Sequence, residues 1–244
     1  ALRMPIGVVL GIVSFVGIAA ITGLSGAWGI LTSIPLNFVA NWNLSAVPMF
    51  LLMGFIAARA GLTNGLFTSA RVFVGRVPGS LASSTVMASA LFASCSGSSM
   101  ATAAAFAKIS VPEMLKAGYK PSLATGSVAA AGTLGSLIPP SILMIVYGIF
   151  TNTSIGDLFM AGVIPGILSA VAYIAMITIR ATLDPTLAPV VEQRHTRKEI
   201  WAALRDIWPL PTLILGVLGG IFSGVFTPTE AGAVGAALAI VIAM

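Results

Sequence analysis

Two short stretches decide the fold of this chain: FASCSGSSM at residues 92–100 and GTLGSLIPPS at residues 132–141. Each interrupts a segment that is otherwise apolar enough for lipid, and each carries residues that end a helix and expose backbone oxygens. An unpaired backbone N–H or C=O in hydrocarbon costs several kcal/mol, so irregular chain at that depth must be buried in protein or line a cavity. We therefore expect the two stretches to form a binding site within a membrane.

Composition places the chain in a lipid bilayer. Of its 244 residues, 57% are hydrophobic and only 8% are charged, whereas a soluble domain carries roughly 25% charged residues. The net charge of +5 comes from basic residues that fall between apolar segments, which fits loops beside a membrane, so we expect no nucleic acid as a partner. The single cysteine, Cys95, allows no intrachain disulfide and no cysteine-based metal cluster.

The order of apolar and polar segments predicts an all-α, polytopic membrane protein. Residues 1–78 are expected to form N-terminal scaffold helices and a surface linker, and residues 79–120 a re-entrant hairpin. Residues 121–180 are expected to form a broken helix followed by a transmembrane helix. The polar residues 181–206 predict a cytoplasmic amphipathic connection, after which residues 207–244 hold a last pair of apolar segments.

The hairpin prediction rests on length and charge. The two arms around SCSGSS have about 15 residues each and reach only ~22 Å, against a hydrocarbon core of ~30 Å. Arg76 precedes the first arm, and Lys116 and Lys120 follow the second, so both ends lie on the same basic side. A re-entrant hairpin satisfies both observations, although two thin full spans with a minimal turn would also return to that side.

The broken-helix prediction rests on Gly132, Gly135 and the pair Pro139-Pro140, which interrupt the apolar stretch at residues 121–150. Proline removes a backbone donor and disfavours helix in the residue before it, so we expect two half-helices with an extended joint. The next loop, residues 151–156, has no basic residue, whereas the loops after Ala58, after Leu115 and after Ile179 do. By the positive-inside rule, the basic loops are cytoplasmic and the hairpin opens from the cytoplasm.

Two capping patterns set the starts of later helices. Ser154 to Asp157 matches a helix start, and Thr227-Pro228-Thr229-Glu230 is a capping box with proline at the first helical position. Glu230 is therefore expected to cap a helix rather than carry protons.

The candidate site consists of neutral oxygens and of residues that break a helix. A hard cation needs several oxygens, and a helix broken in the membrane presents carbonyls to a cation and amides to an anion. The predicted ion- or substrate-binding residues are Ser94, Ser96, Gly97, Ser98, Ser99, Gly132, Thr133, Gly135, Ser136, Pro139 and Pro140. Those expected around sodium are Ser96, Ser98, Ser99, Gly132, Thr133 and Gly135. In the alternative interpretation, these small residues serve close helix packing and the prolines only kink a helix.

An enzyme is not expected. The Gly97-Ser98 region superficially suits an intramembrane serine protease, but such an enzyme needs a base within reach of its serine. The only histidine, His195, lies in the polar connection. Lys108 is expected to extend its ammonium group to the basic interface.

The motifs together resemble the large membrane subunit of tripartite ATP-independent periplasmic (TRAP) transporters. The resemblance lies in FASCSGSSMATAAAFAKISVPEMLKAGY, GTLGSLIPPSILMIVYGIFTNTSIGDLFMAGVIPGIL and GVFTPTEAGAVGA, and it covers essentially the whole chain. It implies a secondary transporter of inverted-repeat, elevator type in the bacterial inner membrane. It also places the first hairpin tip at residues 96–99 and the first broken helix at residues 132–140.

The resemblance further implies Na⁺ as the coupling ion, with no other cofactor. The implied partners are a small membrane subunit and a periplasmic binding protein that delivers an organic acid. The family has a second hairpin and a second broken helix after the TPTEA region, so residues 207–244 would be the incomplete start of a second repeat and the chain a fragment.

From these observations we expect a subunit for sodium-coupled uptake of an organic acid, such as a dicarboxylate, sialic acid or a similar carboxylate. The alternative is a non-transporting membrane scaffold or assembly subunit. A channel is a third interpretation. It is disfavoured because the sequence shows no charged or carbonyl ring repeated along a pore.

Overall fold

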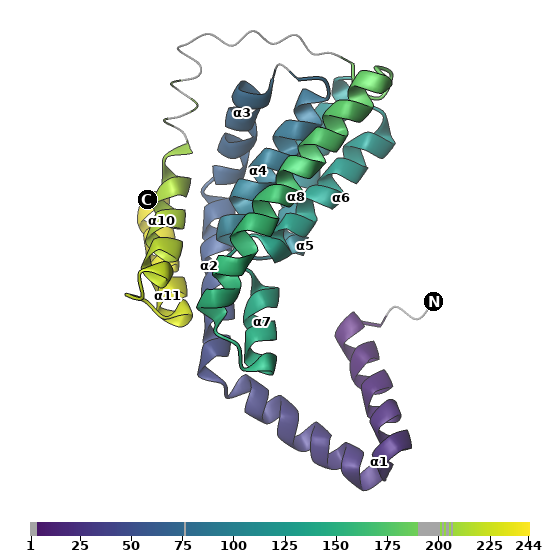
Figure 1. Ribbon diagram of the computed structural model, residues 1–244, viewed down its shortest axis with the longest axis vertical. Helices are drawn as coiled ribbons and strands as arrows, with labels where there is room; N and C mark the ends of the chain where they lie inside the picture. Colours follow the sequence, from purple (N-terminus) through teal and green to yellow (C-terminus); the bar gives the residue numbers. More distant parts are fainter. Residues whose placement is uncertain (1–3, 76, 190–200, 202, 204, 206) are drawn as a thin grey trace. The chain divides into compact units, whose positions relative to one another are not determined.

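The computed structural model describes residues 4–75, 77–189, 201, 203, 205 and 207–244. Residues 1–44 and 45–244 are two separate compact units, and each is described by itself (Figure 1). The described parts of both units are helical, as the apolar segments predict.

The first unit consists of α1, Ile6–Val39, which breaks at Gly23, where φ is +81°. The polar side chains of this helix bond to its own backbone. Thr22, Thr32 and Ser33 each donate to a carbonyl four residues earlier, at 2.7–2.9 Å. Such bonds hide hydroxyl groups from lipid, so polar residues do not end the span.

The short 3-10 helix η1, Trp42–Ser45, follows α1 and crosses the chain boundary between the two units. The helices of the second unit are α2 Ala46–Arg59, α3 Leu62–Val74, α4 Ser80–Ser96, α5 Ser99–Lys116, α6 Pro121–Leu137, α7 Ile142–Thr151, α8 Ile155–Leu183, α10 Pro209–Phe222 and α11 Pro228–Ala243. Helix α4 is at the centre, because it packs against α2, α3, α5, α6, α8 and α10. Its many Ala and Ser side chains let neighbouring helices approach on every side.

Four phenylalanines fill the core around α4. Phe92 and Phe106 meet edge to face across the hairpin, with ring centroids 5.9 Å apart. Phe50 of α2 and Phe159 of α8 do the same at 6.3 Å. All four side chains are fully buried, so one pair joins the two arms of the hairpin and the other joins α2 to α8.

The lengths of the helices agree with a hairpin that ends inside the membrane. Helices α4 and α5, of 17 and 18 residues, do not qualify as spans, whereas Gly7–Val39, Trp42–Arg59 and Ile155–Leu183 are long and apolar enough to cross a membrane. Helices α6 and α7 qualify together, bent by 41°. The tip meets this bend, and α7 continues for ten residues beyond it, so the broken helix extends past the hairpin (Figure 1).

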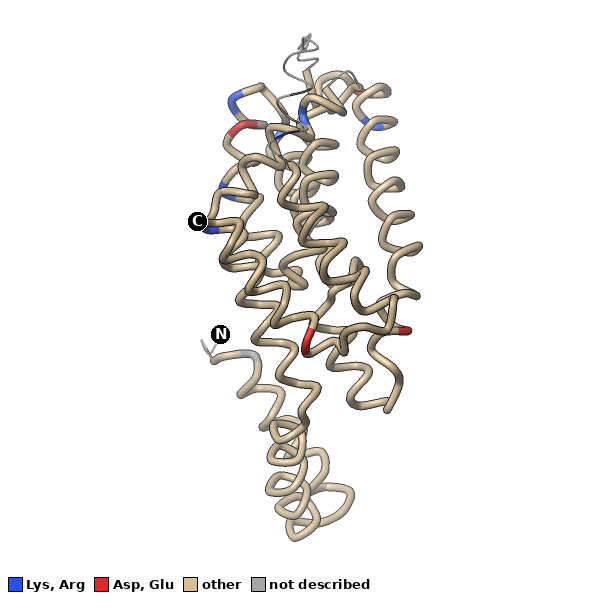
Figure 2. Tube along the Cα trace, turned by 90° about the vertical axis from the view of Figure 1, so that its left-hand side faces the viewer, with Lys and Arg blue, Asp and Glu red and all other residues tan. Residues whose placement is uncertain are grey.

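Charge is distributed unequally along the second unit. Lys and Arg lie in its upper part in Figure 2, at the ends of α2, α3, α5 and α8 and at the start of α6. Acidic residues begin α8 and α11 in the lower part. The upper part also holds Glu113 and Asp184, which pair with basic residues there, and basic residues predominate. The predicted basic side is therefore one end of the folded unit.

The predicted caps are confirmed. The Ser154 hydroxyl accepts from Asp157 N–H at 3.3 Å and starts α8. Thr227 and Glu230 bond reciprocally at the start of α11. Arg76, His195 and residues 190–200 of the polar connection lie outside the described residues.

Candidate functional site

The hairpin tip is a turn of two residues. Helix α4 ends at Ser96, and Gly97 follows with φ +60° while its N–H donates to Ala93 O at 3.0 Å. Ser98 is extended, and its hydroxyl accepts from Ala101 N–H at 3.3 Å to cap α5. Glycine tolerates this left-handed conformation without a steric penalty, and serine is a preferred N-cap, so the sequence GS sets the turn.

The joint of the broken helix comprises residues 138–141 between α6 and α7. Ile138 and Ser141 are extended, and the peptide bond between Pro139 and Pro140 is cis. The Ser141 hydroxyl donates to Ser136 O at 2.7 Å. A side chain of the joint thus satisfies one of the carbonyls that α6 leaves unpaired at its end.

The structure brings the tip and the joint into direct contact. Ile142 N–H, the first amide of α7, donates to Gly97 O at 3.1 Å. A Cβ added at Gly97 would lie 2.7 Å from Pro140 O, and one added at Gly135 would lie 2.8 Å from Ser98 C and O. Because both neighbours are backbone, neither position has room for a side chain.

Gly132 extends this contact one turn along α6. Its added Cβ would lie 2.7 Å from the Cβ of Ala103 and 3.3 Å from Ser99 O. Glycines three residues apart therefore form the face of α6 on which the start of α5 rests.

Four helix ends converge where the tip meets the joint. The carboxyl ends of α4 and α6 carry partial negative charge from unpaired carbonyls, and the amino ends of α5 and α7 carry partial positive charge. The arrangement can therefore bind a cation at the carbonyl ends and a carboxylate at the amide ends without a charged side chain. The described residues include no group of three or more His, Cys, Asp or Glu that could hold a metal ion.

The hydroxyl groups of the predicted site take different directions. The Ser96 hydroxyl lies 2.9 Å from that of Thr102, inside the hairpin. Thr133 is exposed, and its hydroxyl lies 3.1 Å from Tyr173 O–H on α8. Thr133 and Ser136 both belong to α6. The Thr133 hydroxyl points to α8 and not to the tip.

Ser94 and Pro139 lie beside the contact instead of within it. Both line a pocket of about 340 Å³ whose other walls are apolar residues of α4, α8 and α10. The Ser94 hydroxyl bonds to Ala90 O of its own helix at 3.3 Å. On the other face, Ser96 lines an open pocket of about 590 Å³ between α2 and the hairpin.

Sequence reasoning missed four residues around the site. An added Cβ at Gly54 of α2 would lie 2.6 Å from Ser96 Cα, so α2 rests on the tip. Thr102, Ala103 and Ser141 contact the predicted residues as described above. Gly54 interrupts no helix, so nothing in the sequence around it indicates a role at the site. Ser141 belongs to GTLGSLIPPS, so the sequence could have indicated it.

Known proteins resemble this chain along its whole length. The family described as the tripartite ATP-independent periplasmic transporter, DctM component, matches residues 1–244. A C4-dicarboxylate TRAP transporter large permease protein of Pseudomonas aeruginosa is 39% identical over 91% of this chain and 54% of its own length. A sialic acid TRAP transporter large permease protein of Vibrio cholerae is 35% identical over 82% of this chain and 46% of its own length.

An ectoine TRAP transporter large permease protein of Halomonas elongata is 35% identical over 95% of this chain and 54% of its own length. The chain thus spans about half the length of the curated relatives it matches. With helices that can cross a membrane, it is a multi-pass inner-membrane protein of a permease family and not an enzyme. Because the family match covers residues 1–244, the chain belongs to the DctM component family of tripartite ATP-independent periplasmic transporters.

Proposed function

We propose that the chain supplies half of the transport site of a sodium-coupled importer of organic acids. The observation that carries the proposal is the contact of the hairpin tip with the joint, where Gly97 O accepts from Ile142 N–H. Four helix ends meet there without a carboxylate, which favours a weakly held cation bound by neutral oxygens over a structural metal.

The cation-binding atoms in this proposal are backbone carbonyls at the ends of α4 and α6, together with hydroxyls of the tip. Ser96, Ser98, Ser99, Gly132 and Gly135 lie at the contact. Thr133 lies near them within α6, with its hydroxyl at Tyr173 and its backbone carbonyl accepting from the Ser136 hydroxyl at 2.7 Å, so it is not among the proposed ligands. The amide ends of α5 and α7 carry partial positive charge for the carboxylate of the substrate, through N–H groups other than those of Ile142 and Ala101, which donate to Gly97 O and the Ser98 hydroxyl.

Coupling to a cation is what an anionic substrate requires. Moving one negative charge inward against 100 mV costs ~2.3 kcal/mol, so a dicarboxylate costs roughly 4.6 kcal/mol and needs more than two cotransported monovalent cations for net drive from the potential. The relatives are named for C4-dicarboxylates, sialic acid and ectoine, all of which carry a carboxylate. We propose this substrate class, delivered by a periplasmic binding protein to a complex with a small membrane subunit.

The proposed movement is of elevator type. The tip and joint form one packed body with α4, α5 and α6, and such a body can shift as a unit against scaffold helices. The basic end (Figure 2) would face the cytoplasm.

Uptake by the full-length protein tests the coupling. It is reconstituted in proteoliposomes with its binding protein and small subunit, and entry of a radiolabelled C4-dicarboxylate, sialic acid and ectoine is measured with and without an inward Na⁺ gradient. We expect uptake of at least one of them only with the gradient. Equal uptake in K⁺ would contradict sodium coupling, and uptake of none would favour a non-transporting scaffold.

A matched pair of variants tests the site. Gly135→Leu places a side chain against Ser98 backbone, whereas Gly219 of α10 has nothing within 4 Å of an added Cβ. We expect Gly135→Leu to abolish Na⁺-dependent uptake and Gly219→Leu to retain it, with both proteins monodisperse in detergent. Unchanged uptake by Gly135→Leu would show that the contact is not part of the site.

A further inference from the structure

A groove between α6 and α8 lies apart from the tip and joint. It has a volume of about 210 Å³, and its walls include Ser122, Gly126 and Ala130 of α6 and Tyr173, Met176 and Arg180 of α8. The three α6 residues are four apart and share one face of the helix. The groove therefore follows the helices instead of cutting across them.

The two ends of the groove differ in polarity. Ser122 is in the first turn of α6 and Arg180 in the last turn of α8, so both lie at the basic end of the unit. From Ser122 to Ala130 the groove runs eight residues, or ~12 Å along the helix. That length is most of one leaflet of a ~30 Å hydrocarbon core.

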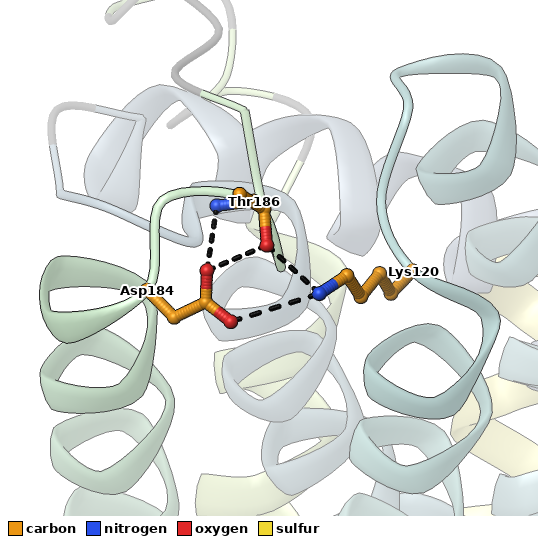
Figure 3. Close-up of polar contacts among 3 residues, drawn as sticks. All are labelled: Lys120, Asp184 and Thr186. Carbon is orange, nitrogen blue, oxygen red and sulfur yellow. Dashed lines mark hydrogen bonds and ion pairs between the residues drawn. The ribbon is translucent and has the colours of Figure 1, made fainter.

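Arg180 is a cation without an acidic partner among the residues that the structure describes. The carboxylate of Asp184, four residues along the chain, binds other groups (Figure 3). It accepts hydrogen bonds from Thr186 N–H at 3.0 Å and from the Thr186 hydroxyl, and it forms an ion pair with Lys120 Nζ at 3.6 Å. Lys120 is thereby neutralised and Arg180 is not. The Ser122 hydroxyl makes no hydrogen bond to any described residue, and Ser122 lines the same groove as Arg180.

The inner part of the groove offers apolar surface. Gly126 is exposed, and an added Cβ there would meet nothing within 4 Å. The Tyr173 hydroxyl at the deep end is already engaged by Thr133 at 3.1 Å. An occupant must therefore carry an anionic group at one end and a hydrocarbon chain behind it.

We propose that this groove binds an anionic phospholipid, with its phosphate at Arg180 and Ser122 and one acyl chain along Gly126 and Ala130. Phosphate suits guanidinium, whose planar donors match its oxygens. A free phosphate would leave the apolar inner part unfilled.

Native mass spectrometry of the full-length protein in mild detergent tests the proposal. Phosphatidylglycerol, phosphatidylcholine and glycerol phosphate are added in turn, and bound adducts are counted. We expect adducts with phosphatidylglycerol at several-fold lower concentration than with phosphatidylcholine, because one arginine near the surface favours an anionic lipid about fivefold. Equal binding of the two lipids would overturn the role of charge, and equal binding of glycerol phosphate would overturn the role of the groove.

Two variants, each with a matched control, locate the site. Arg180→Gln removes the cation, and Arg59→Gln removes another exposed basic residue, at the end of α2, that lines no part of this groove. Gly126→Leu fills the groove, and Gly219→Leu adds the same side chain at an exposed glycine elsewhere with equal space. We expect about fivefold weaker binding for Arg180→Gln, loss of the adduct for Gly126→Leu, and no change for the controls.

The outcome separates this site from other occupants. If Arg59→Gln weakens binding as much as Arg180→Gln, the lipid responds to the basic end in general and the proposal fails. If Gly126→Leu leaves lipid binding intact but releases the small membrane subunit, the groove is a protein interface and the proposal also fails. Sodium-dependent uptake is not measured in these assays, so neither result depends on the proposed transport function.

Discussion

At the scale of single residues, the site depends on glycines that have no space for a side chain. Gly97, Gly132 and Gly135 face backbone or Cβ atoms at 2.7–2.8 Å. Sequence reasoning named them as helix breakers, but only Gly97 stands at a break, whereas Gly132 and Gly135 lie inside α6, which continues to Leu137. Gly54 is as tightly packed but stands inside an uninterrupted helix, α2. The sequence of a single helix does not show which of its residues lie close to another helix. Only the folded structure therefore identifies Gly54 as a contact of the tip.

Gly54→Ala tests this contact. The added Cβ would lie 2.6 Å from Ser96 Cα, and overpacking of this kind costs about 1–3 kcal/mol. We expect a lower midpoint of thermal unfolding in detergent. Gly65→Ala, in α3 with nothing within 4 Å, is the control and should be neutral or stabilising by about 0.5–1 kcal/mol. Equal midpoints for the two variants would mean that α2 does not rest on the tip.

At the scale of elements, helix caps divide into those that only build the fold and those that also face the site. Ser98 caps α5 and Ser154 caps α8, each accepting a backbone N–H at 3.3 Å. The two caps are chemically alike, and the sequence marks both. Their surroundings differ, because only Ser98 lies against α6, within 2.8 Å of the Cβ position of Gly135.

Alanine at either cap separates the two roles. We expect Ser98→Ala and Ser154→Ala to lower stability by a similar amount, about 1 kcal/mol, measured by denaturant or thermal unfolding. Only Ser98→Ala should raise the Na⁺ concentration needed for half-maximal uptake in proteoliposomes. If both variants shift the Na⁺ dependence equally, loss of helix stability explains the effect and Ser98 is not a ligand.

At the scale of the whole second unit, the segment after α8 fastens two distant parts of the chain. Lys120 Nζ donates to the Thr186 hydroxyl at 2.8 Å (Figure 3). Lys120 N–H also donates to Leu187 O at 3.0 Å. The partners are more than 60 residues apart. The hydrogen bonds from Thr186, followed by the nearby Lys120 charge, hold the pKa of Asp184 below its usual value of 3.8.

The lowered pKa of Asp184 gives a pH-dependent prediction. Because the folded state has the lower pKa, the contribution to stability is fully present above pH 3.8 and is lost as the pH falls through the folded value. We expect Asp184→Asn to unfold at a lower temperature than the unmodified protein at pH 7. The difference should shrink below pH 3.8, measured by thermal unfolding from pH 7 to pH 3. A difference that persists unchanged at pH 3 would show that the carboxylate charge is not its cause.

The sequence by itself determined the membrane class, the helical fold, both caps and the two places where helices break. These follow from local chemistry: apolar length, proline without an amide hydrogen, glycine at positive φ and serine or threonine ahead of a helix. Only the tertiary structure decided that the tip rests on the joint, that α2 covers the tip through Gly54, and that the Thr133 hydroxyl turns to Tyr173. These depend on which faces of separate helices meet, and that is a property of packing between segments distant in the chain.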